Sequence, residues 1–158
     1  MSAYQEIYEE VTSLAGRINA RHSEPDWTPI RHLYKSLSRR SVAALLRLSR
    51  VGLVTPLRDG MNLVAKEYVA AQNPRDPGVL VLSELAGAAS ELDGALLVNP
   101  YDLDGVAAAI QEALTIPMGE RLDRWQGMMK RLSVDTAQRW SQRFLAELSE
   151  TASAIRAA

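Results

Sequence analysis

The stretch that decides the fold reads VGLVTPLRDGMNLVAKEYVAAQ and covers residues 51–72. Its first part, residues 51–55, is a short apolar run rich in Val and Leu, which predicts a buried strand. Residues 56–62 contain a proline, a glycine and an asparagine, which are typical of a loop. From Leu63 onward good helix formers dominate, so we expect a helix there. The stretch therefore predicts a strand, a loop and a helix in succession.

A strand that runs through a loop into a helix can bind an anion at the start of the helix. The first backbone N–H groups have no partner within the helix, and the helix dipole adds partial positive charge there. Gly60 has no side chain, so a ligand can approach its backbone closely. Glu67 lies one turn after Leu63 on the same helix face, and Asp59 offers a second carboxylate for hydroxyl groups. This combination describes a pocket for a sugar nucleotide.

Each of these residues also has an ordinary structural explanation. Asn62 can be a helix N-cap, Gly60 a turn residue and Glu67 a solvated surface charge. Residue types alone leave both interpretations open.

Composition narrows the class of protein. The chain has 158 residues, 47% hydrophobic and 23% charged, which predicts one soluble globular domain. A net charge of -1 gives no reason to expect nucleic acid or an anionic membrane surface as a partner. Cysteine is absent, and the spacing of His22 and His32 matches no zinc motif, so we expect no metal. With no signal peptide and no run of about 18 apolar residues, a cytoplasmic location is expected.

Apolar periodicity predicts alternating strands and helices along most of the chain. Ser38 is a good N-cap for a helix that ends at Leu48 or Ser49. Other helices are expected at residues 4–21, 84–89, 118–132 and 135–155, and one more, with Val106 and Ile110 on its apolar face, ends before Pro117. The other strands are expected at residues 30–34, 78–83 and 95–98. This order predicts an α/β fold, a parallel sheet with flanking helices, in which ligands sit beyond the carboxyl ends of the strands.

Three large aromatic residues in the last helices, Trp125, Trp140 and Phe144, are expected to anchor the packing of those helices. Arg39 and Arg40 are interpreted as the solvated start of their helix.

Three strings in order resemble the donor-binding domain of the trehalose-6-phosphate synthases: RDGMNLVAKEYVA at residues 58–70, GVLVLSELAGAA at 78–89 and LLVNPYD at 96–102. That family consists of retaining glycosyltransferases of the two-domain GT-B class, with Rossmann-like domains. YQEIYEEVTSLAGRIN and DWTPI extend the resemblance almost to the first residue. Ala20 stands where the family usually has Gly, and His22-Ser23 where it has Phe-Gly.

The resemblance implies a transfer of glucose from UDP-glucose to glucose 6-phosphate with retained configuration and without a cofactor. Asp59 would be the catalytic residue that holds glucose hydroxyls, and Glu67 would hold the ribose hydroxyls. Lys66 would lie at the phosphates, or serve only as a solvated helix lysine. Leu37 would contact the base through its main chain. The residues expected to bind UDP-glucose are Leu37, Asp59, Gly60, Met61, Asn62, Leu63, Val64, Ala65, Lys66 and Glu67.

By this resemblance the chain covers only about a third of a family enzyme. We therefore expect residues 1–158 to form a single truncated UDP-glucose-binding domain, with C-terminal helices at about 118–156. It would lack the acceptor domain and the Arg and Lys that hold the diphosphate, and would be inactive alone. Its protein partner would be the missing acceptor domain or a second copy of the chain. Two alternatives stay open: a non-catalytic module that binds a sugar nucleotide or a protein, and a piece of a related GT-B enzyme with another acceptor.

Overall fold

The computed structural model describes residues 3–157, with side chains for residues 4–149. The chain divides into two compact units, which meet in sequence between Leu37 and Ser38, and each is described by itself. The single domain expected from the length of the chain stays a prediction. Among the described residues, no helix combines the length and the apolar character that a membrane span needs.

The first unit consists of helix α1 (Ala3–His22) and the segment that follows it. The Asn19 side chain donates to the Ile30 carbonyl at 2.9 Å and accepts from the Ile30 N–H at 3.0 Å. The rings of Tyr8 and Tyr34 pack with their centroids 4.4 Å apart. The strand predicted at residues 30–34 is wrong. Among the described residues the strands all lie in the other unit, and the Ile30 backbone is bonded to the Asn19 side chain instead of a neighbouring strand.

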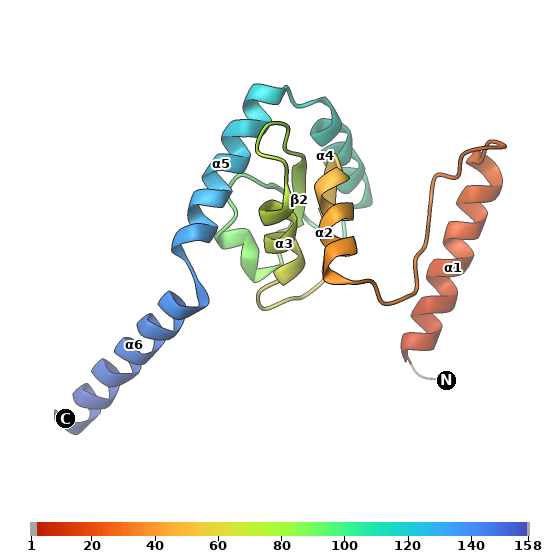
Figure 1. Ribbon diagram of the computed structural model, residues 1–158. Helices are drawn as coiled ribbons and strands as arrows, with labels where there is room; N and C mark the ends of the chain where they lie inside the picture. The colour runs from red at the N-terminus through yellow and green to blue at the C-terminus, as the bar shows by residue number, and fades with distance from the viewer. Residues whose placement is uncertain (1–2, 158) are drawn as a thin grey trace. The chain divides into compact units, whose positions relative to one another are not determined.

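The second unit is built on a parallel sheet, whose central strand β2 is labelled in Figure 1. Its strands are β1 (Val51–Val54), β2 (Val79–Ser83) and β3 (Leu96–Val98), in the order β1-β2-β3. The register pairs Val51 with Val79 and Val81 with Leu96. Every residue of the central strand β2 is buried, as expected for a strand covered on both faces. The predicted parallel α/β sheet is confirmed.

The helices of the second unit match the predicted positions. They are α2 (Arg39–Leu48), α3 (Leu63–Ala71), α4 (Leu103–Thr115), α5 (Met118–Val134) and α6 (Ala137–Ala157), with a 3-10 helix η1 (Gly87–Ser90) where a tight helical segment is expected. Ser38 caps α2, because its Oγ accepts from the Ser41 N–H at 3.1 Å. Asp102 caps α4 through the Gly105 N–H in the same way.

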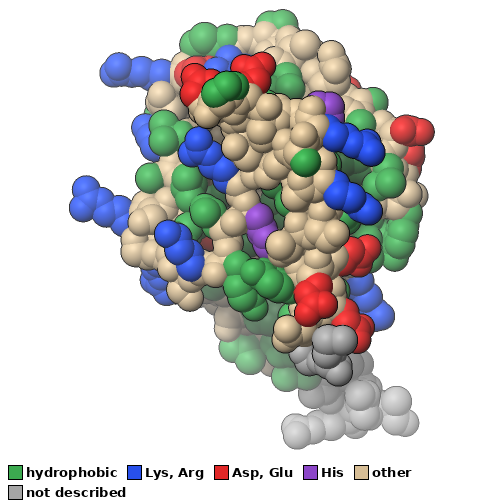
Figure 2. Space-filling view, turned by 90° about the vertical axis from the view of Figure 1, so that its right-hand side faces the viewer, with side chains coloured by type: hydrophobic (Ala, Val, Ile, Leu, Met, Phe, Trp, Pro, Cys, Tyr) green, Lys and Arg blue, Asp and Glu red, His purple; other side chains and the backbone are tan. Residues whose placement is uncertain are grey.

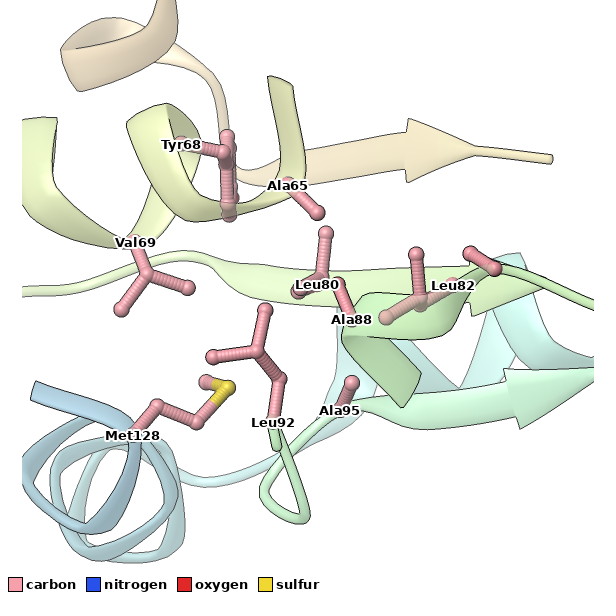
Figure 3. Packing of buried hydrophobic residues seen from close by; sticks show 10 residues of the cluster. Ala65, Tyr68, Val69, Leu80, Leu82, Ala88, Leu92, Ala95 and Met128 are labelled. Carbon is pink, nitrogen blue, oxygen red and sulfur yellow. The ribbon is translucent and has the colours of Figure 1, made fainter. Parts of the chain in front are cut away.

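Alternation along β2 builds a core on each face of the sheet. Successive side chains of a strand point to opposite faces, so Leu80 and Leu82 enter one core and Val79 and Val81 the other. The first core also contains side chains from α3, from the segment after β2 and from α5, as Figure 3 shows. The second core is closed by α4. The sheet is thereby fixed between helices on both sides.

Tyr68 joins α3 to the sheet at a point where only glycine fits. Its ring is buried, and its Oη donates to the Ser49 carbonyl at 3.1 Å. A Cβ on Gly52 would lie 2.6 Å from the ring, and a Cβ on Gly78 would lie 2.2 Å from Oη. Burial raises the pKa of Tyr68 to about 12, so the hydroxyl stays neutral and keeps donating. The position of α3 over β1 therefore depends on this ring.

An ion-pair cluster holds α5 to the turn before β2. Asp76 Oδ1 accepts from Arg50 Nη1 at 2.9 Å and from Arg121 Nη1 at 2.7 Å. Arg121 is buried, and it also donates to the Pro77 carbonyl. The hydrogen bonds from Arg50 and then from Arg121 lower the pKa of Asp76 from 3.8 to about 2.

The three large aromatic residues behave differently from one another. Trp125 is partly buried against the first core, and its Nε1 donates to the Val69 carbonyl at 2.9 Å, which confirms it as an anchor. Trp140 and Phe144 are 59% and 52% exposed, and they stack on each other with centroids 5.5 Å apart. For these two the predicted anchoring is wrong, because all described side chains of α6 are exposed.

The face shown in Figure 2 carries basic and acidic side chains interspersed with hydrophobic ones. Such a mixture accords with the net charge of -1.

Replacing Gly52 by Ala should destabilise the fold, because the new methyl group would overlap the Tyr68 ring. We expect a loss of about 1–3 kcal/mol in the free energy of unfolding, measured by urea denaturation. Gly127→Ala is the matched control, since a Cβ there meets no atom within 4 Å, and it should be neutral or stabilising by about 0.5–1 kcal/mol. Equal stability of the Gly52→Ala variant and the wild type would contradict this account of Tyr68.

Asp76 should make stability depend on acid. Its folded-state pKa lies below its unfolded value, so its contribution is present above pH 3.8 and is lost as the pH falls from 3.8 through about 2. We expect Asp76→Asn to lower stability at pH 7 and to flatten the pH dependence in that window. Thermal unfolding at a series of pH values measures both effects. Asp123→Asn, at an exposed site on α5, should keep the acid-dependent step. An Asp76→Asn variant with the wild-type pH profile would rule the cluster out.

Candidate functional site

The candidate site lies in the second unit, where the loop after β1 leads into α3. This loop lies at the carboxyl ends of the parallel strands, which is where ligands bind in such sheets. The loop runs beside the segment that follows β2, and Asp59 and Ala86 form an isolated parallel bridge. The predicted strand, loop and helix are thus present at the predicted residues. The predicted burial of the strand is wrong, because β1 stands at the end of the strand order and its Leu53 is 47% exposed.

Asn62 holds the loop and the helix together. Its backbone φ is 78°, in the left-handed region that asparagine tolerates better than most residues. Its Oδ1 accepts from the Ala65 N–H at 2.9 Å, and its Nδ2 donates to Asp59 Oδ2 at 3.0 Å. The N-cap explanation of Asn62 is therefore correct, and the same side chain also fixes the Asp59 carboxylate.

The Asp59 carboxylate is held at both oxygens. Oδ1 accepts from the Met61 N–H at 3.0 Å, while Oδ2 accepts from Asn62. A carboxylate offers about four lone-pair sites, so each oxygen can accept a further bond from a hydroxyl group. The side chain is half-buried and oriented before any ligand arrives.

Three main-chain hydrogen bonds join the loop to the segment after β2. The Asp59 N–H donates to the Leu85 carbonyl at 3.4 Å, and the Gly87 N–H donates to the Asp59 carbonyl at 2.9 Å. The Ala88 N–H donates to the Met61 carbonyl at 2.7 Å. In the sequence this segment is recognisable only as a run of small residues. Such a run predicts close packing but does not indicate that the loop is its partner.

Gly60 is exposed, and nothing in the described residues requires a glycine there. Its φ is not positive, and a Cβ built on it meets no atom within 4 Å. Both common structural reasons for glycine are therefore absent from this part of the chain.

The first turn of α3 presents free donors beside a buried anchor. The N–H groups of Leu63 and Val64 open the helix and have no acceptor within it, and both side chains are exposed. Ala65 is fully buried, and its N–H is bonded to Asn62. Within the expected binding set, Ala65 thus fixes the start of the helix in the core.

Two charged residues of α3 have different surroundings. Lys66 Nζ lies 2.5 Å from Glu91 Oε2, and both side chains are partly buried. Lys66 is therefore neither a freely solvated lysine nor an unpaired cation at the helix start. Glu67 is exposed, and it makes no hydrogen bond or ion pair with the described residues.

Leu37 does not belong to the same compact unit as the other expected residues. It is half-buried and belongs to the first compact unit, whereas Asp59 to Glu67 all belong to the second. The structure brings the latter together around one loop and one helix start.

A cavity of about 340 Å³ adjoins this loop. Its size lies at the lower end of the range of about 300–1,000 Å³ that is usual for ligand pockets. It is lined by Gly60, Met61, Leu63, Lys66, Glu91, Asp135, Thr136, Ala137, Trp140 and Arg143. The sequence did not point to Glu91, Trp140 or Arg143 as neighbours of the loop. Within the described residues, no group of three or more His, Cys, Asp and Glu side chains could hold a metal ion.

Comparison with known proteins assigns the chain to a family. The family model described as Glycosyltransferase family 20 matches residues 1–150. The trehalose-6-phosphate synthase of Sinorhizobium fredii (strain NBRC 101917 / NGR234) is 54% identical over 146 residues, which are 92% of this chain and 32% of that relative. The chain spans about a third of the length of the curated relatives it matches.

Solved structures agree in fold and in extent. An alpha,alpha-trehalose-phosphate synthase (UDP-forming) from Burkholderia xenovorans, in complex with glucose-6-phosphate, is 54% identical with a TM-score of 0.90; the match covers 94% of this chain and 33% of that one. An E. coli structure described as trehalose-6-phosphate bound with UDP-2-fluoro glucose is 50% identical with a TM-score of 0.89 and covers the same shares. With the family model matching nearly its whole length, this chain belongs to glycosyltransferase family 20.

Proposed function

We propose that this chain is the donor-binding, C-terminal part of a trehalose-6-phosphate synthase, which transfers glucose from UDP-glucose to glucose 6-phosphate with retention. The similar structures contain UDP-2-fluoro glucose and glucose-6-phosphate, which supports the two substrate classes. The observation that carries the proposal is the loop at the start of α3. There an oriented carboxylate, a bare glycine backbone and unpaired helix N–H groups lie within a few residues of one another.

Each part of this loop suits one part of a sugar nucleotide. Asp59 accepts hydrogen bonds from glucose hydroxyls, and the backbone around Gly60 lets the sugar approach. The N–H groups of Leu63 and Val64, with the helix dipole, face the diphosphate. Glu67 is free to accept both hydroxyls of a ribose. Ribose recognition by Glu67 and base contact by the Leu37 main chain complete the donor contacts that we propose.

The chemistry then rests on orientation and electrostatics. No side chain of this set needs to act as a nucleophile, because the leaving diphosphate can help to deprotonate the acceptor on the same face of the sugar. The protein contributes by holding the reactants in place and by stabilising the charge that develops on the phosphates. In this chain Lys66, the lysine in the first turns of α3, is paired with Glu91. We therefore propose that the chain binds the donor in the cytoplasm but does not turn over alone.

The ion pair at Lys66 also favours a second candidate function. A module that binds a sugar nucleotide without transferring it has no need of a cation to stabilise a leaving diphosphate. Formation of trehalose 6-phosphate by the purified chain from UDP-glucose and glucose 6-phosphate would exclude this alternative and would contradict the expected inactivity.

Glu67→Ala should abolish most of the affinity for UDP. A hydrogen bond to a charged group contributes about 1.5–3 kcal/mol, which corresponds to roughly a tenfold to hundredfold weaker binding. Calorimetric titration of the 158-residue chain with UDP and UDP-glucose measures the loss. Glu112→Ala, an exposed carboxylate on α4, is the control and should bind as the wild type does. Unchanged affinity in the Glu67→Ala variant would remove Glu67 from the site.

We also propose that α6 has a protein partner: the acceptor part of the synthase or, in the isolated chain, a second copy. In the part of α6 whose side chains the structure describes, the large exposed apolar side chains are Trp140, Phe144, Leu145 and Leu148. Sedimentation should therefore give a mass that rises with concentration, and Trp140→Glu combined with Phe144→Glu should keep the chain monomeric. Gln142→Glu, which adds charge to α6 without removing an aromatic ring, should still associate. A strictly monomeric wild type at high concentration would contradict the second copy as partner.

A further inference from the structure

Gly87 stands where the segment after β2 passes against the backbone of the candidate loop. Its N–H donates to the Asp59 carbonyl at 2.9 Å. A Cβ built on Gly87 would lie 2.2 Å from the Gly60 carbonyl oxygen and 2.7 Å from the Gly60 carbonyl carbon, whereas real Cβ contacts essentially never fall below 3.0 Å. The φ of Gly87 is not positive, so the requirement for glycine is steric. Any side chain at this position would push the loop and η1 apart.

The rest of the segment is fixed from behind. Ser83, the last residue of β2, is fully buried, and its Oγ accepts from the Leu85 N–H at 3.1 Å. This bond turns the chain so that the Leu85 carbonyl accepts from the Asp59 N–H. Further along, Ala88 donates to the Met61 carbonyl. The end of β2 therefore fixes the position of the segment, and the segment in turn fixes the position of the loop.

The segment reaches the two ends of the candidate site unequally. Main-chain bonds and the close contact at Gly87 act on residues 59–61. The helix start is held by burial of Ala65 and Tyr68 in the core and by the Asn62 cap, which also bonds the Asp59 carboxylate. A change at Gly87 should therefore move the loop more than it moves α3.

We infer that Gly87 is a positioning residue that sets the specificity of the site for the sugar. The inference rests on the proposed function, in which Asp59 and Gly60 serve the glucose while the helix start and Glu67 serve the UDP. Gly87 touches no ligand. It acts by allowing the Gly60 carbonyl and the Asp59 backbone to lie where the Asp59 carboxylate meets the sugar hydroxyls.

The test is a set of titrations of the full chain with UDP and with UDP-glucose. In Gly87→Ala the affinity for UDP-glucose should fall by roughly tenfold to a hundredfold, as expected for weakened hydrogen bonds to the Asp59 carboxylate, while the affinity for UDP stays close to the wild-type value. Ser83→Ala removes the acceptor of the Leu85 N–H without adding bulk, and it should cause a smaller loss of the same kind. Gly127→Ala, where a Cβ meets open space, should change neither affinity.

The ratio of the two dissociation constants decides the outcome, because a general loss of folding would weaken both ligands together. Thermal unfolding checks whether each variant is folded. If Gly87→Ala does not fold, the ratio measured for Ser83→Ala decides alone. A wild-type ratio in these variants, with UDP and UDP-glucose still bound by the wild type, would overturn this inference and leave the proposed function intact. Failure of the wild type to bind either ligand would overturn both.

Discussion

The candidate site depends on the main-chain hydrogen bonds between the loop after β1 and the segment after β2, at the carboxyl ends of these strands. Parallel pairing of β1 with β2 brings the two strand ends side by side, so the segments that leave them run together. The bonds from Gly87 to the Asp59 carbonyl and from Ala88 to the Met61 carbonyl continue that pairing beyond the strands. Backbone groups that would otherwise be left without partners are thereby satisfied. The loop gains one defined conformation in which the Asp59 carboxylate and the bare Gly60 backbone are presented.

The helix that completes the site is fixed by the core. Tyr68 fills the space left by Gly52, and Trp125 of α5 donates to the Val69 carbonyl. The Arg47 side chain of α2 donates to the carbonyls of Ala71 and Gln72 at the end of α3. Both ends of this short helix are thus held, so the N–H groups of its first turn keep a fixed position and direction. Donors fixed in advance stabilise developing charge without the cost of reorganisation, which is what phosphate chemistry requires of a protein.

Local patterns were sufficient to predict the elements of the second unit. The apolar run at residues 79–83, the Ser38 cap and the strand–loop–helix stretch each carry their signal within a few residues. The wrongly predicted strand at residues 30–34 also comes from reliance on a local pattern. A short apolar run does not indicate whether a neighbouring strand exists. The predicted packing of Trp140 and Phe144 is wrong, because large aromatic residues are usually packed, whereas here they remain exposed on α6.

The site was only half predictable for a related reason. Asp59, Gly60 and Asn62 stand together in the sequence, and residue types and family resemblance point to them directly. Gly87 and Glu91 act across 25 or more positions, through a steric contact with Gly60 and an ion pair with Lys66. No periodicity or motif encodes such contacts, and only the parallel register of β1 and β2 reveals them.

The most direct test of this account is amide hydrogen exchange in the ligand-free chain. If the loop is formed before a ligand binds, the amides of Gly87 and Ala88 should be protected to nearly the same degree as those of β2, because their acceptors lie in the loop. The Ala65 amide, bonded to Asn62, should be protected as well. Rapid exchange at Gly87 and Ala88, with β2 still protected, would contradict the claim that the fold builds the site in advance.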